Sequence, residues 1–232
     1  MPRIARTAPK ANIYHIFTRG NNRQNIFREE SDYKKYIDIL LKYKDTYHFK
    51  LYHYVLMSNH VHLVMEVAEH GGDLSQIMKG INLSYVQYYK SRYEHIGHFW
   101  QDRYKSIIIS KDTYLLACGS YVELNPVRAS IVVDPKDYRW SSYNFYAYGK
   151  RDILIDEHPI YPNLAKDERE RRQGYRDFVK GMIREKDAMR GEMSRRLVYG
   201  SDEFIALLKK QYKMNAVIKR RGRPKKDDGN NK

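Results

Sequence analysis

Hydrophobic residues along the first part of the chain follow strand-like and helix-like spacings in turn. Residues 12–19 alternate between two faces, as a β-strand does, and the turn residues Gly20, Asn21 and Asn22 end this strand. One face of the strand carries Ile13, His15 and Phe17. From Ser31, a residue type that caps helices, hydrophobic positions recur every three or four residues and predict a helix. These positions are Tyr33, Tyr36, Ile37, Leu40, Leu41 and Tyr47.

Two short segments rich in aromatic and β-branched residues follow, at 49–57 and 60–67. Only Ser58 and Asn59 separate them, so an antiparallel hairpin is the simplest interpretation. Asp73 can cap a long second helix, and Gly97 ends that region. The hydrophobic stripe of this helix consists of Leu74, Ile77, Met78, Ile81, Tyr85 and Tyr89.

A fourth strand is expected at 103–110, and a third helix after it, capped by Ser110 or Asp112 and stopped by Pro126. The core side of this helix is expected to carry Leu115, Cys118 and Val122. The first six elements run strand, helix, strand, strand, helix, strand. This order predicts an α+β fold, a ferredoxin-like split βαβ sandwich with a four-stranded antiparallel sheet and two helices on one face. The third helix is an addition.

Beyond residue 129 the periodic pattern weakens. We expect one main domain over residues 1–150, a mainly helical C-terminal region over 151–218, and a disordered basic tail over 219–232. The tail contains Arg221-Gly222-Arg223-Pro224, which is similar to an AT-hook, a basic arm that enters the minor groove of A·T-rich DNA. A tail that only increases solubility is the alternative, so Arg221 and Arg223 are candidate DNA contacts.

The net charge of +15 is far more than solubility requires and indicates a partner rich in phosphates. Nucleic acid is the first such partner to consider, and 22 tyrosines offer faces on which bases can stack, although tyrosines at the edge of an aromatic core would look the same. The sequence contains no apolar stretch long enough to indicate a membrane-spanning helix. With a single cysteine and no apolar leader, the sequence favours the cytoplasm.

His60 and His62 stand two residues apart on a predicted strand, so both imidazoles point to the same face and can share one metal ion. Histidines that make hydrogen bonds within the core are the alternative. Residues on the other face, such as Val61 and Leu63, are apolar, so the strand buries one side and offers the histidine side to something else.

Tyr121 and Asn125 lie four residues apart on the predicted third helix and so project from one face. A phenol is a poor nucleophile while protonated, so Tyr121 needs an activated phosphate, which a metal ion on the two histidines can supply. Asn125 can add an amide oxygen, and this set of ligands suits Mg²⁺ or Mn²⁺ better than a closed zinc site. A core tyrosine and a helix-capping asparagine are the alternatives.

Four segments resemble a known family in the same order along the chain. They are RGNNRQNIF at 19–27, YVLMSNHVHLV at 54–64, FWQDRYKS at 99–106 and YVELNPVRA at 121–129. The sequence is similar to the single-tyrosine HUH transposases, and most similar to those associated with REP elements. The resemblance spans about residues 11–148.

The resemblance implies a ferredoxin-like domain, a divalent metal ion on His60, His62 and Asn125, and Tyr121 as the nucleophile. It implies an enzyme without an organic cofactor that binds DNA hairpins and cleaves and rejoins single-stranded DNA through a 5′-phosphotyrosine link, acting as a monomer or homodimer. Two alternatives are a domesticated hairpin-binding regulator with little or no transposition activity and a replication-initiator or relaxase type of HUH nuclease.

Two groups of residues are candidates for binding the DNA strand. Arg103, Tyr104 and Lys105 adjoin the predicted site, and Arg19, Asn21 and Arg23 surround the turn after the first strand. A salt-bridged strand start and an ordinary turn are the structural alternatives for these two groups.

Overall fold

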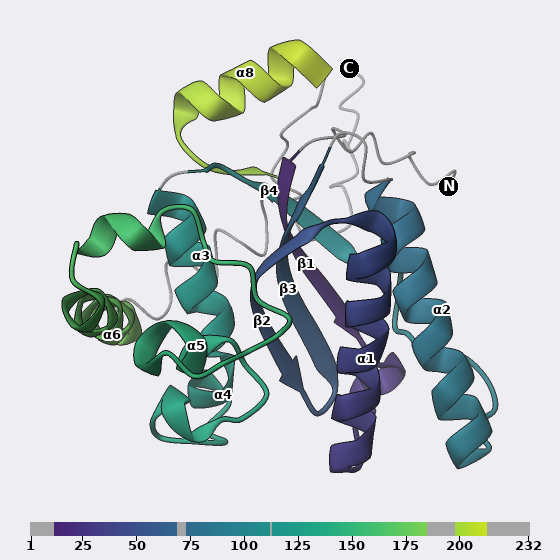
Figure 1. Ribbon diagram of the computed structural model, residues 1–232. Helices are drawn as coiled ribbons and strands as arrows, with labels where there is room; N and C mark the ends of the chain where they lie inside the picture. Colours follow the sequence, from purple (N-terminus) through teal and green to yellow (C-terminus); the bar gives the residue numbers. More distant parts are fainter. Residues whose placement is uncertain (1–11, 69–72, 112, 185–197, 213–232) are drawn as a thin grey trace, which may run out of the picture.

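The computed structural model describes residues 12–68, 73–111, 113–184 and 198–212, and Figure 1 shows their arrangement. The first part contains β1 (Asn12–Arg19), η1 (Asn21–Arg23), α1 (Glu30–Tyr47), β2 (Lys50–Met57), β3 (His60–Val67), α2 (Leu74–Tyr93) and β4 (Lys105–Ile109). The second part contains α3 (Thr113–Glu123), α4 (Asn125–Arg128), η2 (Pro135–Asp137), α5 (Tyr143–Tyr148), η3 (Tyr161–Leu164), α6 (Glu168–Arg184), β5 (Val198–Tyr199) and α8 (Asp202–Tyr212).

The sheet has the strand order β2-β3-β1-β4-β5. Its first four strands pair antiparallel, which confirms the predicted ferredoxin-like arrangement, with β1 lying between β3 and β4. The prediction of four strands is one strand short, because β5 pairs parallel with the outer edge of β4. Two residues carry no detectable periodicity, and this strand could not have been read from the sequence.

Helices α1 and α2 pack together on one face of the sheet (Figure 1). All six residues of the predicted α2 stripe are buried there, since a helix whose apolar residues fall on one side gains most by turning that side to a sheet. Asp73 caps α2 as expected, accepting a hydrogen bond from the Ser75 amide at 3.0 Å.

Helix α1 begins earlier than its sequence predicts. Ser31 was the expected cap, but Glu29 holds that position. The reason is Asp32, whose buried carboxylate accepts the backbone amides of Arg28 and Glu29 at 2.7 and 3.0 Å and also the hydroxyl of Tyr88 on α2. A partner on another helix therefore fixes where α1 starts.

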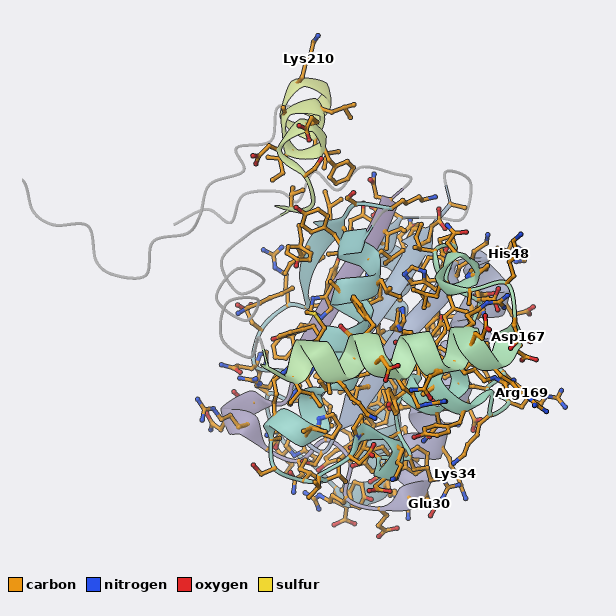
Figure 2. All side chains as sticks on the ribbon, turned by 90° about the vertical axis from the view of Figure 1, so that its left-hand side faces the viewer. Glu30, Lys34, His48, Asp167, Arg169 and Lys210 are labelled. Carbon is orange, nitrogen blue, oxygen red and sulfur yellow. The ribbon has the colours of Figure 1, made fainter. Side chains whose placement is uncertain are left out.

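The opposite face of the sheet is covered by α3, and α6 packs against α3 and α5 on the outer side (Figure 1). Leu115, Cys118 and Val122 of α3 are fully buried against this face, as predicted. Figure 2 shows α6 running across this side of the molecule, with α8 projecting from the body and carrying Lys210 toward its far end. Capping by Asp112 falls outside the described residues.

Residues after 150 pack into the same body as those before it. Leu154 is buried in the core beside α1 and α2, and the Asp156 amide donates to the Leu51 carbonyl at 2.9 Å. Tyr175 and Val179 of α6 share a buried cluster with Leu116 of α3. These contacts join residues on the two sides of position 150, and the expected tail at 219–232 lies outside the described ranges.

Candidate active site

The pairing of the strands assembles a polar group on the face of the sheet that α3 covers. His60 pairs with Arg19, and His62 pairs with Phe17, which in turn pairs with Lys105 on β4. Residues directly opposite each other on neighbouring strands share a face. The two histidines predicted to bind a metal thus lie side by side with two of the cations predicted to bind DNA.

A third histidine, His15, belongs to this group. It lies one row further along β1 and stacks on His62, with ring centroids 5.0 Å apart and planes 8° from parallel. Its Nε2 is 2.8 Å from His62 Nδ1. Strand alternation places His15 on the same face as Phe17, but no role could be predicted for it, because its contact with His62 joins residues 47 positions apart.

Hydrogen bonds at the Nδ1 atoms leave the Nε2 atoms of His60 and His62 as the candidate ligands. Asn59 Oδ1 lies 2.5 Å from His60 Nδ1, and because the Asn59 amide nitrogen donates to the Arg23 carbonyl, this oxygen must be the acceptor. His60 Nδ1 therefore carries the proton, and Nε2 has a free lone pair. His62 Nδ1 shares a hydrogen bond with His15 Nε2, and when His62 is the donor its Nε2 is free in the same way.

Burial keeps these imidazoles neutral. It lowers the pKa of His15 to about 4. Burial, with Arg19 nearby, lowers the pKa of His60 to about 4. Burial and the neighbouring His15 and His60 hold the pKa of His62 well below its usual value. A neutral imidazole is the form that binds a metal ion, so the pair is ready for that role at neutral pH.

Tyr121 on α3 lies above these rings. Its ring meets His62 and His15 edge to face, with centroids 6.3 and 6.1 Å away. The Arg128 guanidinium lies 4.2 Å from the centre of the Tyr121 ring and donates to the Tyr121 carbonyl at 2.7 and 2.9 Å. No role was predicted for Arg128, although it lies in the fourth motif.

Asn125 does not lie on the same continuous helix as Tyr121. Helix α3 ends at Glu123, and α4 begins at Asn125, with Pro126 in its first turn, where a missing amide hydrogen costs nothing. The Asn125 Nδ2 donates to the carbonyls of Tyr121 and Val122 at 3.1 and 2.9 Å. The side chain thus caps α3, and its Oδ1 is the atom that could serve as a ligand.

Comparison with known proteins settles the family. A family model described as "Transposase IS200 like" matches residues 10–125, half of the chain. The chain belongs to the IS200-like transposases. No curated protein matches the sequence of this transposase.

One solved structure shares its fold. The structure of a REP-associated tyrosine transposase bound to a REP hairpin has a TM-score of 0.56 at 19% identity, covering 67% of this chain and 92% of that one. A protein of Deinococcus radiodurans described as a transposase has a TM-score of 0.37 at 17% identity, covering 56% and 92% of the two chains.

Backbone hydrogen bonds join three of the four family motifs of the transposase at one end of the sheet. The Gly20 amide donates to the Asn59 carbonyl at 3.0 Å, and the Asn21 amide donates to the Phe99 carbonyl at 2.8 Å. A Cβ on Gly20 would stand 2.6 Å from the Gln24 carbonyl oxygen, so the tight turn here requires glycine. These segments, far apart in sequence, together form the rim beside His60.

Some of the residues predicted to contact DNA are exposed in the structure, and one of them, Tyr104, is buried. Lys105 begins β4 and is exposed, whereas Arg103 lies in the loop before it, because the strand starts two residues later than expected. Tyr104 is only 8% exposed and packs into the core on the α1 and α2 side, so its ring is not available to stack on a base, which corrects that prediction.

Of the other predicted contacts, Arg19 rests on the Phe17 ring at 4.8 Å, and Asn21 and Arg23 lie in η1 with the Arg23 side chain exposed. Arg221 and Arg223 fall outside the described residues.

No cluster of three or more histidine, cysteine, aspartate or glutamate side chains able to hold a metal ion occurs within the described ranges. The metal site predicted from the sequence, with His60, His62 and Asn125 as ligands, stays a prediction. Among the described helices, none is both long and apolar enough to cross a membrane.

Proposed function

We propose that this transposase is of the REP-associated type, and that it binds DNA hairpins and cleaves and rejoins single-stranded DNA with Tyr121 as the nucleophile. One observation supports this above all: the Tyr121 ring lies against His62 and under Arg128, in a group of neutral imidazoles flanked by Arg19 and Lys105. A phosphate entering this group would meet a nucleophile and positive charge together.

The residues fit a divalent metal ion. His60 keeps an Nε2 lone pair, His62 keeps one when its Nδ1 donates to His15, and Asn125 keeps an amide oxygen, a set that suits Mg²⁺ or Mn²⁺. When bound, the ion would polarise a non-bridging oxygen of the scissile phosphate. The protein's part is to hold these ligands: Asn59 fixes the His60 ring, and His15 fixes the His62 ring.

In the cleavage step, the Tyr121 oxygen attacks the phosphorus and the P–O3′ bond breaks. The phenol loses its proton to solvent, and the leaving 3′ oxygen takes up a proton to become a hydroxyl. The new 5′-phosphotyrosine retains a phosphodiester, so attack by a 3′-hydroxyl can reverse the step and join strands without ATP. Arg128, beside the Tyr121 ring, and Arg19, beside His60, would neutralise the phosphate oxygens.

Hairpin DNA as the substrate rests on two supports. The net charge of +15 favours binding to phosphates, and the structural neighbour at 19% identity was solved with a REP hairpin. A domesticated regulator that binds hairpins without cutting is the second candidate. The joint presence of Tyr121, His60 and His62 at one site favours the enzyme, because a regulator has no use for a nucleophile.

The nucleophile is tested by replacing Tyr121 with phenylalanine, which removes only the phenolic oxygen. Tyr121→Phe should abolish the covalent adduct with a labelled hairpin oligonucleotide in Mn²⁺, while the Kd for the same DNA stays within about twofold. Tyr114→Phe is the matched control, since Tyr114 lies on the same helix with its ring against Tyr199. An adduct that survives in Tyr121→Phe but disappears in Tyr114→Phe would reassign the nucleophile.

A further inference from the structure

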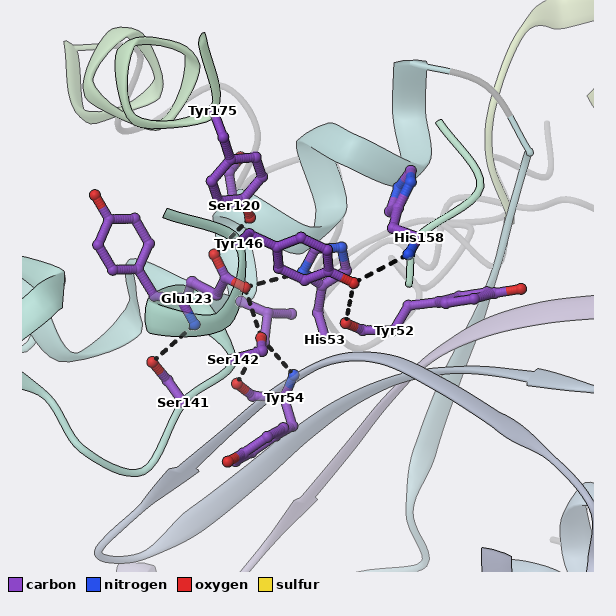
Figure 3. Close-up of polar contacts among 12 residues, drawn as sticks. Tyr52, His53, Tyr54, Ser120, Glu123, Ser141, Ser142, Tyr146, His158 and Tyr175 are labelled. Atoms are coloured by element: carbon purple, nitrogen blue, oxygen red, sulfur yellow. Dashed lines mark hydrogen bonds and ion pairs between the residues drawn. The ribbon is translucent and has the colours of Figure 1, made fainter. Parts of the chain in front are cut away.

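A buried carboxylate stands at the end of the helix that carries Tyr121. Glu123 is the last residue of α3 and is fully buried. Its Oε1 accepts hydrogen bonds from His53 Nδ1 at 2.9 Å and from Ser142 Oγ at 2.6 Å, and its Oε2 accepts one from the Tyr175 hydroxyl at 2.6 Å (Figure 3). Both oxygens are therefore engaged.

The three donors come from separate parts of the chain. His53 lies on β2, Ser142 directly precedes α5, and Tyr175 lies on α6. Ser142 is itself joined to β2, since its Oγ accepts from the Tyr54 amide at 3.0 Å and its own amide donates to the Tyr54 carbonyl at 3.1 Å (Figure 3). Through Glu123, the last turn of α3 is thus tied to the sheet on one side and to α6 on the other.

Helix α3 also approaches His53 closely at a second point. A Cβ on Gly119 would lie 2.4 Å from His53 Nε2, nearer than any side chain could stand. His53 therefore contacts α3 two residues before Tyr121 and two residues after it. The helix can neither rotate nor slide on β2 without breaking the bond at Glu123 or colliding at Gly119.

Stability alone does not account for this carboxylate. Removing a charge from water costs free energy, and buried polar groups of this kind can often be replaced by apolar residues without loss of stability. Its position adds to that cost, because a helix dipole disfavours negative charge at the C-terminal end. What the three directional hydrogen bonds do is hold the helix in a single orientation.

We propose that Glu123 is a positioning residue for the nucleophile, and that through Tyr175 it makes α6 a required part of the catalytic unit. This rests on the proposed role of Tyr121. Glu123 touches neither His60, nor His62, nor the DNA in this scheme. It acts by holding α3 so that Tyr121 faces His62.

The test removes one hydroxyl from each of two buried tyrosines in the same cluster. Tyr175→Phe deletes the donor to Glu123 Oε2. Tyr161→Phe, the matched control, deletes the donor to the Tyr146 carbonyl at 2.7 Å and leaves Glu123 untouched. Single-turnover cleavage of a labelled hairpin at saturating DNA, its Kd and the thermal unfolding midpoint are measured for both variants in Mn²⁺.

Tyr175→Phe should lower the single-turnover rate by about tenfold, the size expected when a hydrogen bond to a charged group is lost, with the Kd within about twofold. Tyr161→Phe should lose comparable thermal stability yet keep its rate. Equal losses of rate in both variants, or no loss in Tyr175→Phe, would overturn the proposal.

A second measurement does not depend on cleavage. With 3-fluorotyrosine at position 121, the ¹⁹F resonance reports the surroundings of that ring directly. It should shift or broaden in Tyr175→Phe and remain in place in Tyr161→Phe. An unchanged resonance in both would overturn the positioning role, whereas a shift in a protein that forms no adduct at residue 121 would instead refute the proposed function.

Discussion

Single hydrogen bonds decide what the histidines of the site can do. His15 and His62 are neutral and share one hydrogen bond between ring nitrogens, so one ring donates and the other accepts. If His62 Nδ1 donates, its Nε2 is free for a metal ion. If His15 donates, His62 Nε2 carries the proton and cannot bind one. His15 thus selects between a competent and an incompetent tautomer of His62.

Replacing His15 should therefore weaken metal binding without removing a ligand. His15→Phe keeps a ring stacked on His62 but leaves it no acceptor, and loss of such a partner typically costs about 10- to 100-fold in metal affinity. Calorimetric titration with Mn²⁺ in the absence of DNA measures this. His158→Phe, which removes a buried histidine outside this group, should leave the Mn²⁺ affinity unchanged. Equal affinities for wild type and His15→Phe would show that His15 does not set the tautomer.

At the scale of elements, Gly119 sets the distance between α3 and β2, because it has no side chain. Gly119 faces the His53 ring, and that ring is held by Glu123. Gly174, on α6, has open space where a Cβ would stand. The two glycines are both helical, so alanine gives the same gain in helix propensity at either position, and only the packing differs.

Alanine at these two positions should change stability in opposite directions. Gly174→Ala should raise the free energy of unfolding by up to about 1 kcal/mol. Gly119→Ala should lower it by about 1 to 3 kcal/mol through overpacking, and should slow cleavage because α3 is displaced. Urea unfolding and single-turnover cleavage measure the two effects. A stabilised and fully active Gly119→Ala would mean that α3 moves freely on β2.

Most elements of the fold could be predicted because each turns one face to the core. The hairpin at β2 and β3 and the stripe of α2 follow directly from hydrophobic spacing. The start of α1 could not be predicted, because Asp32 takes its partner from α2. The same holds for β5, whose two residues are a strand only because β4 offers an open edge.

The site divides in the same way. His60, His62 and Tyr121 lie within short motifs whose spacing suggests chemistry, and the structure brings these three together. His15 and Glu123 could not be assigned, because their contacts join residues 47 and 52 positions apart. Only the folded chain pairs such residues. Tyr104 was misassigned for another reason. Its place in a motif does not show which face of the sheet its side chain lies on, and it lies on the face that α1 and α2 cover.

At the scale of the whole molecule, buried histidines couple stability to pH. His158 is fully buried, and burial, aided by the nearby His53, lowers its pKa to about 3. Its Nδ1 accepts the Ile160 amide at 2.9 Å, a bond that requires the unprotonated atom. In the unfolded chain the pKa is near 6.5, so below that pH the unfolded state binds the proton that the folded state excludes.

Burial of neutral His158 should therefore cost no stability above pH 6.5. As the pH drops from 6.5 toward 3, the free energy of unfolding should fall. His158 alone should contribute a slope of about 1.4 kcal/mol per pH unit in that window. Denaturant unfolding between pH 7 and pH 4 measures it, and His158→Gln should flatten the slope. His98→Gln, at an exposed position, should not. Identical slopes for wild type and His158→Gln would place the acid sensitivity elsewhere.

The fifth strand, β5, bears on how the chain folds during its synthesis. Residues of β1 to β4 leave the ribosome long before Val198 and Tyr199, which pair with Ile108 and Ile109. Until then the nascent sheet presents the outer edge of β4, with unpaired amides and carbonyls that another strand can join. In a stalled or truncated chain that edge would stay unpaired, and it could pair with the same edge of another nascent chain on the same mRNA. In the finished protein, two late residues cover the part of this edge at Ile108 and Ile109.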